Sequence, residues 1–374
     1  MKENIYLVGA GLTRFGEWWD KSLRQLIDEA IGSAIRSSNI DAREIDLVIV
    51  ANMLAEITNN QATLGSLTSS LLPGRPAAMR VEAACGSGAV ALHTATAFLE
   101  SGRARTVLVV GAEKMTDVSN DIVSQALMGA ADAELDLPSG LTFPGIFGLI
   151  ASRYMYEFGL TREELSIVSA VHHRNAMQNP FAQFRVELTP EAVSKSTLVS
   201  DPLRLLDCSP ISDGAAACIL STKHKSALKL VASQIASDTP SITQRATITS
   251  FPATREAFTK ALGEASLERK DILVAETHDC FSIAAIINME DLGFAERGEG
   301  VRVYKDLYEK RAPLFVNMGG GLKACGHPVA ATGIKQLIDA GKHLTSAKAR
   351  FGVTHNFGGA GTTCGIHILE NTAV

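Results

Sequence analysis

The chain has 374 residues, more than one simple domain usually holds, so its length favours two core-forming units or one large fused fold. Hydrophobic residues make up 46% of the chain and charged residues 20%, and this balance excludes a disordered protein. The net charge is -5 and no block of basic residues stands out, which argues against nucleic acid as a partner.

The predicted elements alternate between strands and helices from the start of the chain. The run NIYLVGA (4–10) predicts a strand that enters a glycine turn, and Arg14 stands where a dinucleotide fingerprint needs its third glycine, which argues against NAD. A helix follows near 21–37, then a strand at DLVIVANM (46–53), a helix after Cys85 and a strand at TVLVVGAEK (106–114). This alternation predicts an α/β layered fold.

The alternation breaks from about 115 to 200, where short helices and loops mix, and we interpret this stretch as an insertion. Strand signals resume at DGAAACILST (213–222), after which a second unit begins. We therefore expect two halves, 1–222 and 227–374, with the insertion in the first. The segments beginning CGSGAV at 85 and CGHPVA at 325 are loosely alike, which agrees with an ancient internal duplication.

The six cysteines form no CxxC pair and no close Cys/His cluster of the zinc-finger type, so we expect no bound metal. The first apolar run is too short for a secretory signal, and no apolar stretch reaches membrane-spanning length. We expect free thiols in a reducing cytoplasm and no membrane association.

Cys85 stands at the start of an alanine-rich predicted helix in VEAACGSGAVAL (81–92). The positive end of the helix dipole and the unpaired backbone N–H groups would favour its thiolate and make it reactive. For an isolated cysteine, packing in the core would be the more common role.

Two further segments carry candidate reactive groups. In GGGLKACGHPVAATG (319–333), His327 precedes Pro328, which suits a first helical position, so we expect the imidazole at a helix entrance after a glycine-rich approach. In THDCFS (277–282), His278 and Cys280 follow a strand and precede a helix, where ligand clefts form in α/β layers. For Cys280 and His278 the alternative is core packing.

The segment THNFGGAGTTCGIHILE (354–370) predicts a tight hairpin around Gly358 that aims backbone N–H groups inward. Cys364 lies beyond the turn and shares a strand face with Ile366 and Ile368. We therefore expect Cys364 to pack in the core.

Taken together, these segments resemble the thiolase family over nearly the whole chain. The matching stretches are Cys85-Gly86-Ser87, Gly326-His327-Pro328, Asn356-Phe357-Gly358 and CSPISDGAAACIL at 208–220. The resemblance implies two similar α/β halves in αβαβα layers with a loop-domain insertion. It also implies coenzyme A thioesters, above all acetyl-CoA, as substrates, with no permanently bound cofactor.

The HDCF form at 278–281 is that of sterol-carrier-protein-2 type thiolases, and the chain looks closest to the archaeal and bacterial members, which make acetoacetyl-CoA for the mevalonate route. Many thiolases carry a second reactive cysteine where this chain has Asn356. The resemblance implies that the second reactive thiol of the HDCF branch lies in the HDCF loop instead, at Cys280.

The resemblance assigns expected roles to the site residues. Cys85 is the nucleophile, His327 takes its proton, and Cys280 removes a proton from the second acetyl-CoA. His278 and His327 would hold the enolate oxygen, and the N–H groups of Gly358 and Cys85 the acyl-enzyme oxyanion.

The same resemblance places coenzyme A against the insertion. Ser209 would lie near the pantetheine, and apolar side chains from the insertion would line a short acyl pocket or only pack the insertion. The residues concerned are Phe143, Phe147 and Met155, and the unranked candidates for the phosphates are Arg174, Arg185 and Arg204.

Several alternatives remain at this point. They are a thiolase for longer or aryl 3-ketoacyl-CoAs, a decarboxylating ketoacyl synthase that uses the same Cys-His-His set, and a non-catalytic acyl-CoA or lipid carrier. A hydroxymethylglutaryl-CoA synthase would need a glutamate acid/base, for which the sequence offers no matching candidate. As partners, the family implies a homodimer or dimer of dimers, and a complex with 3-hydroxy-3-methylglutaryl-CoA synthase and a small zinc-containing acyl-CoA-binding protein.

Overall fold

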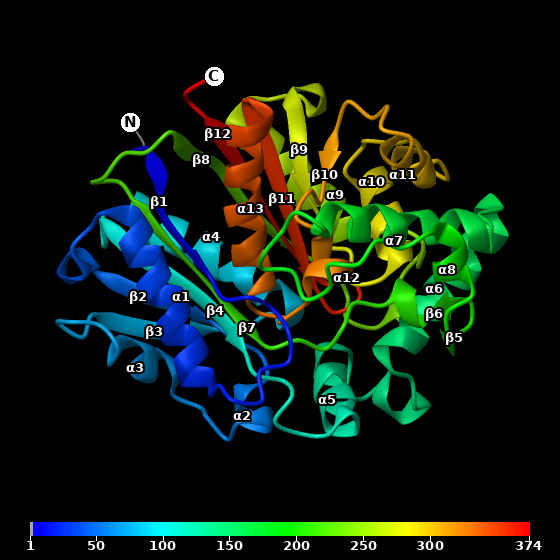
Figure 1. Cartoon of the computed structure of the whole chain (residues 1–374), viewed down its shortest axis with the longest axis horizontal. Helices are drawn as coiled ribbons and strands as arrows, with labels where there is room; N and C mark the ends of the chain where they lie inside the picture. Colours follow the sequence, from blue (N-terminus) through cyan, green and yellow to red (C-terminus); the bar gives the residue numbers. More distant parts are fainter. Residues whose placement is uncertain (1–2) are drawn as a thin grey trace.

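The computed structural model describes residues 3–374 and is organised around one long, bent sheet (Figure 1). Within the described residues this sheet has ten strands in the order β10-β9-β11-β12-β8-β1-β7-β4-β2-β3. The strands from the first part of the chain are β1 (Ile5–Leu12), β2 (Leu47–Ala51), β3 (Ala77–Val81), β4 (Thr106–Glu113) and β7 (Gly214–Ser221). Those from the second part are β8 (Leu228–Ser237), β9 (Ile272–Glu276), β10 (Phe315–Val316), β11 (Phe351–Gly358) and β12 (Thr363–Asn371).

The two groups of strands repeat one pairing pattern. In the first group, β2 is parallel to β3 and β4, and β4 is antiparallel to β7. In the second group, β9 is parallel to β10 and β11, and β11 is antiparallel to β12. β1 and β8 occupy matching places and join the groups by antiparallel pairing at Ile5↔Leu230 and Tyr6↔Lys229. A shared strand order with shared directions favours the internal duplication expected from the sequence.

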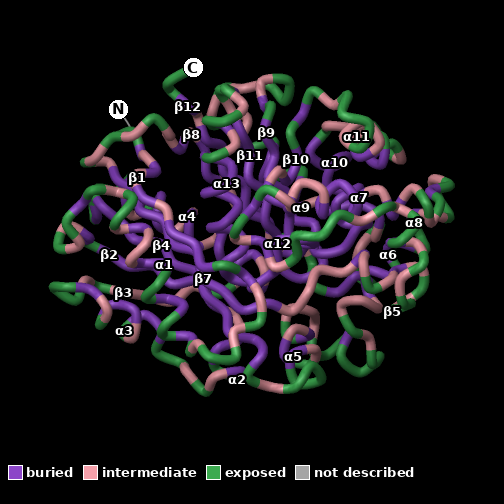
Figure 2. The backbone as a smooth tube through the Cα atoms, viewed as in Figure 1, coloured by how far each residue is buried: buried purple, intermediate pink, exposed green. Residues whose placement is uncertain are grey.

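Helices form three layers around the sheet. α1 (Leu23–Ser38) packs on β1 and β7, and α9 (Pro252–Ala265) packs on β8 and β12. Between the two strand groups lie α4 (Ser87–Glu100) and α13 (Thr332–Ala347), each of which contacts strands of both groups. The predicted αβαβα layering is thereby confirmed, and Figure 2 shows that the buried backbone is concentrated around α13, β7 and β11.

The segment between β4 and β7 forms a separate set of short elements. It contains α5 (Asn120–Leu127), α6 (Phe143–Phe158), α7 (Arg162–Ala176), α8 (Pro190–Ser194) and the hairpin of β5 (Leu198–Ser200) with β6 (Leu203–Arg204). α7 begins with a capping box in which Thr161 and Glu164 satisfy each other's backbone N–H groups. It packs against α10 (Ser282–Asp291), α11 (Gly300–Tyr308) and α12 (Gly321–Cys325), so this segment covers elements of the second part of the chain.

The remaining helices are α2 (Ala55–Thr58) and α3 (Leu64–Ser69), which lie near β2 and β3. From residue 3 to the C-terminus, no helix has both the length and the apolar character that a membrane crossing requires.

Two local predictions were wrong. The first glycine pair is not a turn, because Gly9 and Gly11 lie inside β1. A Cβ on Gly11 would stand 2.1 Å from the Ala30 carbonyl oxygen, so the small residue lets α1 lie close against the strand. Pro328 is not the first residue of a helix either, because α13 begins only at Thr332 after a turn closed by the Ala331 N–H and the Pro328 carbonyl.

Candidate active site

Cys85 lies in a tight turn between β3 and the start of α4, as predicted. The residue before it, Ala84, has φ 51°, a left-handed conformation that is rare for alanine. The Ser87 hydroxyl holds this turn, since its oxygen accepts from the Ala83 N–H at 2.9 Å and its proton goes to the Ala84 carbonyl at 2.6 Å. The thiol is thus presented by a fixed backbone at a helix N-terminus.

His278 and Cys280 follow β9 and precede α10, and Asp279 between them is buried with four polar neighbours. Its carboxylate accepts from the Leu322 N–H at 2.8 Å and the Lys323 N–H at 3.2 Å, both in α12. It also lies 2.8 Å from Nδ1 of His172 in α7. This carboxylate therefore ties the HDCF loop to the glycine-rich loop and to the insertion, a role the sequence analysis did not assign.

His327 lies in the loop between α12 and α13, and its imidazole is held from behind. Nδ1 is 2.7 Å from the Thr332 hydroxyl, and the His327 N–H donates to the Ser212 hydroxyl at 2.9 Å. Burial lowers the pKa of His327 to about 4, so the ring is neutral at physiological pH.

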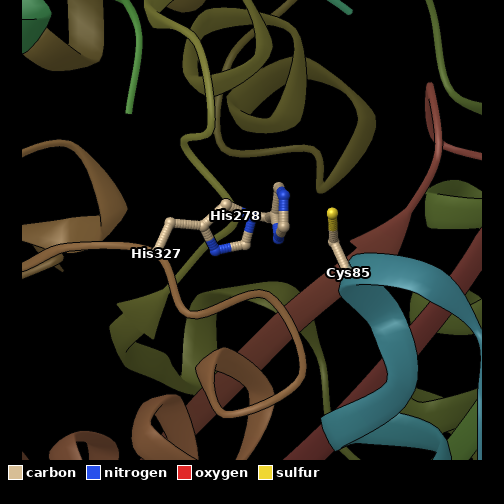
Figure 3. A group of neighbouring side chains, drawn as sticks. All are labelled: Cys85, His278 and His327. Atoms are coloured by element: carbon tan, nitrogen blue, oxygen red, sulfur yellow. The ribbon is translucent and has the colours of Figure 1, made fainter. Parts of the chain in front are cut away.

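Cys85, His278 and His327 come together, although the first is far from the other two in sequence. One side-chain sulfur or nitrogen from each lies within 4.8 Å of the others, and the two imidazole rings stand edge to face (Figure 3). A thiol and two imidazoles at this spacing could ligate a soft metal ion or surround a carbonyl oxygen.

A cavity of about 180 Å³ opens beside these groups. Cys85, Cys280 and His327 line one part of its wall, and Ser209, Phe143 and Phe147 line another. The other apolar candidate, Met155, instead packs against the core of the second strand group. The two thiols singled out in the sequence therefore face the same small space.

Cys364 does not line this cavity. It is fully buried in β12, in register with Phe357 of β11, and its sulfur is 3.7 Å from the Thr254 hydroxyl. This position agrees with the core packing expected from strand alternation.

The resting thiols do not have the lowered pKa values that a helix N-terminus suggests. Burial, reinforced by Glu113, raises the pKa of Cys85 to about 12. The pKa of Cys280 is also raised, first by burial and then by Cys85. Desolvation outweighs the helix dipole at both positions, so a proton acceptor has to act on each thiol.

Comparisons with known proteins agree with this geometry. The family model for the thiolase N-terminal domain matches residues 5–224, and the thiolase C-terminal domain-like model matches residues 235–371. The chain belongs to the thiolase family.

The thiolase is 42% identical to the acetyl-CoA acetyltransferase of Methanothermobacter thermautotrophicus, over 98% of this chain and 99% of the relative. It is 28% identical to sterol carrier protein 2 of Bos taurus, over 96% of this chain and 70% of the relative, in keeping with the HDCF branch. Among solved structures, the acetyl-CoA acetyltransferase from Syntrophomonas wolfei shares the fold, with a TM-score of 0.77, 18% identity and coverage of 99% and 100% of the two chains.

The three candidate phosphate-binding arginines of the thiolase are each engaged with backbone carbonyls. Arg174 donates to the Leu307 carbonyl at 2.7 Å, and the guanidinium of Arg185 donates to Met177 at 3.0 Å. Arg204 donates to the Ser196 carbonyl at 2.8 Å. None of the three lines the cavity beside Cys85.

Sequence reasoning missed Glu113, which ends β4 and is completely buried. Its carboxylate accepts from the Met53 N–H at 2.6 Å, the Leu54 N–H at 3.2 Å and the Asn52 amide at 3.0 Å. Burial raises the pKa of Glu113 to about 8. A carboxyl group that accepts from three donors orders the loop after β2. The signal for it in the sequence was an acidic residue at the end of an apolar strand.

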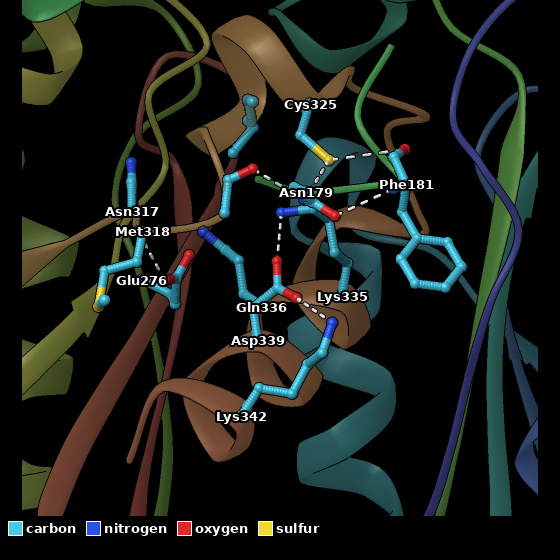
Figure 4. A network of polar contacts seen from close by, with 12 residues as sticks. Asn179, Phe181, Glu276, Asn317, Met318, Cys325, Lys335, Gln336, Asp339 and Lys342 are labelled. Atoms are coloured by element: carbon cyan, nitrogen blue, oxygen red, sulfur yellow. Dashed lines mark hydrogen bonds and ion pairs between the residues drawn. The ribbon is translucent and has the colours of Figure 1, made fainter. Parts of the chain in front are cut away.

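The helix behind the catalytic loops of the thiolase carries a buried ion pair, drawn in Figure 4. Lys335 Nζ and Asp339 Oδ2 of α13 are 2.7 Å apart, and each side chain is only 2% exposed. Nearby, the Asn179 amide donates to the Gly319 carbonyl at 2.8 Å. The Asn179 amide therefore anchors the start of the glycine-rich segment that leads to His327.

Proposed function

We propose that this thiolase joins two acetyl-CoA molecules to give acetoacetyl-CoA and free coenzyme A, and catalyses the reverse thiolysis. The observation that carries the proposal is that Cys85, Cys280 and His327 line one small cavity. The reaction needs one thiol to hold the acyl group, and it needs a second group to remove a proton from carbon.

In the first step, His327 takes the proton of Cys85, and the thiolate attacks the carbonyl carbon of acetyl-CoA. A bond from Cys85 sulfur to the acetyl carbon forms, and the bond from that carbon to the sulfur of coenzyme A breaks. The proton on His327 passes to the departing sulfur, which leaves an acetylated Cys85.

In the second step, His327, neutral again, takes the proton of Cys280, and the Cys280 thiolate takes a proton from the methyl carbon of the second acetyl-CoA. The resulting enolate attacks the acetyl carbon on Cys85, the carbon–sulfur bond to Cys85 breaks, and the proton on His327 passes to the sulfur of Cys85, while Cys280 keeps the proton from carbon. His278 and His327 face the enolate oxygen, while the N–H groups of Gly358 and Cys85 stabilise the oxyanion on the acetyl group.

For coenzyme A, we propose that Ser209 and Phe143 contact the pantetheine end, because both line the cavity. Arg174, Arg185 and Arg204 remain the candidates for the phosphates. Their contacts with carbonyls mean that each would have to share or exchange a hydrogen bond on binding. Replacing each arginine with Gln and measuring KM for acetyl-CoA tests this assignment.

The alternative activities are less well supported. A decarboxylating ketoacyl synthase obtains its carbanion by loss of carbon dioxide, so it has no use for a thiol base at Cys280. A cavity of about 180 Å³ favours a short acyl group over long or aryl 3-ketoacyl chains.

The broader organisation also stays a proposal. We propose halves at 1–222 and 227–374, with the insertion at about 115–200, a cytoplasmic location, and a homodimer or dimer of dimers. Association with 3-hydroxy-3-methylglutaryl-CoA synthase and a small zinc-containing acyl-CoA-binding protein, in the mevalonate route, rests on the family resemblance alone.

Steady-state assays with purified protein test the function directly. We expect thiolysis of acetoacetyl-CoA with free coenzyme A, with a higher kcat/KM than for longer or aryl 3-ketoacyl-CoAs, and no product from malonyl-CoA. His327→Ala should lower the rate by orders of magnitude with unchanged circular dichroism. Malonyl-CoA-dependent turnover, or the absence of any acyl transfer, would refute the proposal.

A further inference from the structure

Asn356 and His278 form a buried pair of side chains behind the catalytic cavity. Asn356 Nδ2 lies 3.0 Å from Nδ1 of His278, and both residues are at most 1% exposed. The other ring nitrogen of His278, Nε2, is buried without a hydrogen-bond partner among residues 3–374. Nδ1 of His278 therefore forms a hydrogen bond within the protein, and Nε2 is left to form one with a ligand.

We propose that Asn356 is a positioning residue that locks His278 in the tautomer with the proton on Nε2. This inference rests on the proposed function for its consequence, because the Nε2–H would then donate to the enolate oxygen. Asn356 stands where two-cysteine thiolases have their hairpin cysteine, so the position keeps a role in the site while its chemistry changes.

The surroundings of the amide fix which end faces the imidazole. Gly333 lies beside both Asn356 Oδ1 and the backbone nitrogen of Ala89. A Cβ added to Gly333 would lie 2.6 Å from that oxygen and 2.5 Å from that nitrogen, so the two atoms are close neighbours of the same glycine. Ala89 belongs to the first turn of α4, the electropositive end of that helix. Oδ1 accepts no hydrogen bond among residues 3–374, but the electropositive helix end favours an oxygen over an NH₂ group there, so Nδ2 is the atom that faces His278.

The direction of the hydrogen bond then determines the tautomer. An amide NH₂ can only donate, so Nδ1 of His278 must accept with its lone pair, and the ring proton must sit on Nε2. The ring is held in place by the Phe357 ring, 4.2 Å away between centroids, and by the His278 N–H, which donates to Nδ1 of His355 at 3.3 Å.

His327 is held in the opposite state. The Thr332 hydroxyl donates to the Pro328 carbonyl at 3.2 Å, so its oxygen is left to accept from Nδ1–H of His327 at 2.7 Å. Nε2 of His327 then carries the lone pair that takes the Cys85 proton. One imidazole starts the cycle as a proton acceptor and the other as a donor, and the two neighbours Thr332 and Asn356 make the difference.

Asn356→Asp is the decisive variant, because a carboxylate accepts where the amide donates. It should draw the proton of His278 to Nδ1, or hold the ring as imidazolium with both nitrogens protonated. Asn371→Asp is the matched control, since Asn371 is also buried in the sheet but lies at the far end of β12.

The test is long-range ¹H–¹⁵N correlation on histidine-labelled protein, with the His278 signals identified by their loss in His278→Asn. We expect wild type and Asn371→Asp to show an unprotonated Nδ1 and a protonated Nε2, and Asn356→Asp to show a protonated Nδ1. A protonated Nδ1 in the wild type, or no change in Asn356→Asp, would overturn the proposal. If the variant fails to fold, the wild-type spectrum alone still decides.

Kinetics give a second readout. In Asn356→Asp, condensation should fall by about 10²-fold or more, as for loss of one oxyanion donor. Single-turnover acetylation of Cys85 should stay within a few-fold of wild type, because that step does not use the enolate site. Residual condensation in Asn356→Asp should decline as pH rises and the imidazolium loses its Nε2 proton, whereas a merely structural defect would lower both half-reactions at every pH. A wild-type spectrum with the expected tautomer in a protein that does not condense acetyl-CoA would refute the function and leave the tautomer standing.

Discussion

The imidazoles of His278 and His327 stand edge to face, with ring centroids 5.1 Å apart and an interplanar angle of 85°. Both rings are buried, and burial lowers both pKa values, to about 4 for His327 and well below the ordinary 6.5 for His278. Two neutral rings can lie this close without charge repulsion, whereas two imidazolium ions would repel each other.

This arrangement predicts acid sensitivity of the fold. The unfolded chain binds protons on these rings below pH 6.5 and the folded protein does not, so stability is lost as pH falls from 6.5 towards 4. His327 alone contributes a loss of roughly 3 kcal/mol once pH is below both of its pKa values. Urea unfolding at pH 7.5, 6 and 5 measures the effect. His327→Asn should show a smaller loss, and a flat profile for the wild type would contradict the prediction.

Cys85→Ala should abolish both acyl-enzyme formation and thiolysis. In the proposed mechanism this thiol forms the covalent bond to the acetyl group, and alanine offers no nucleophile in its place. Intact-mass measurement after addition of acetyl-CoA gives the answer, with a gain of one acetyl group in the wild type. An acetyl group on another thiol of the variant would show that the nucleophile is elsewhere.

Cys280→Ala and Cys364→Ala should behave differently. Cys280 lines the cavity, so its loss should block condensation while Cys85 still takes an acetyl group. Cys364 is fully buried in the core, so its truncation should cost about 1 kcal/mol of stability and leave the rates nearly unchanged. The reverse pattern would remove Cys280 from the mechanism.

Gly358→Ala should push the hairpin away from the Cys85 turn. A Cβ there would stand 2.2 Å from the Ala83 carbonyl oxygen, a contact that backbone atoms cannot avoid by rotating. We expect loss of turnover by at least ~10²-fold, the effect of one lost oxyanion donor. Gly129→Ala is the matched control, since a Cβ on Gly129 meets nothing within 4 Å, and wild-type rates in Gly358→Ala would exclude a role for this close approach.

Asp339→Asn should leave Lys335 as a buried charge without its partner. Breaking a buried ion pair on one side typically costs about 3–5 kcal/mol, whereas replacing both members by apolar residues is often close to neutral. Urea unfolding of Asp339→Asn, Lys335→Met and the double variant Lys335→Met/Asp339→Leu tests the pair. The double variant should be more stable than either single variant, and additive losses would contradict the coupling.

Much of the fold followed from the sequence because its signals are local. The apolar run at 106–113 and the alternation around Cys364 each specify a strand from a few neighbouring residues. The short strand β3 was not predicted, since its residues are only half-buried and it lies at the edge of the sheet. Gly11 was misread as part of a turn because the reason for it, the Ala30 carbonyl of α1, is distant in sequence.

The site could also be predicted only where its signals are local. Cys85, Cys280 and His327 were identified from short motifs, and the structure brings all three to one cavity. The raised pKa values of the thiols depend on burial by the insertion and both strand groups, which no local pattern reports. The bridging role of Asp279 depends on His172, 107 positions earlier in the chain, and appears only when the insertion is seen packed on the second strand group.

The repeated strand pattern has a consequence for how the reaction is divided. In the proposed mechanism, the residue that forms the covalent bond, Cys85, comes from the first set of strands and helices. The groups that move or hold protons, His278, Cys280 and His327, come from the second. The repeated strand order favours descent from a doubled ancestral unit, and in the proposed mechanism each copy carries a different part of the chemistry on its own scaffold. The proposed reaction therefore takes place where the two strand groups meet, and neither group alone carries all the residues that this mechanism requires.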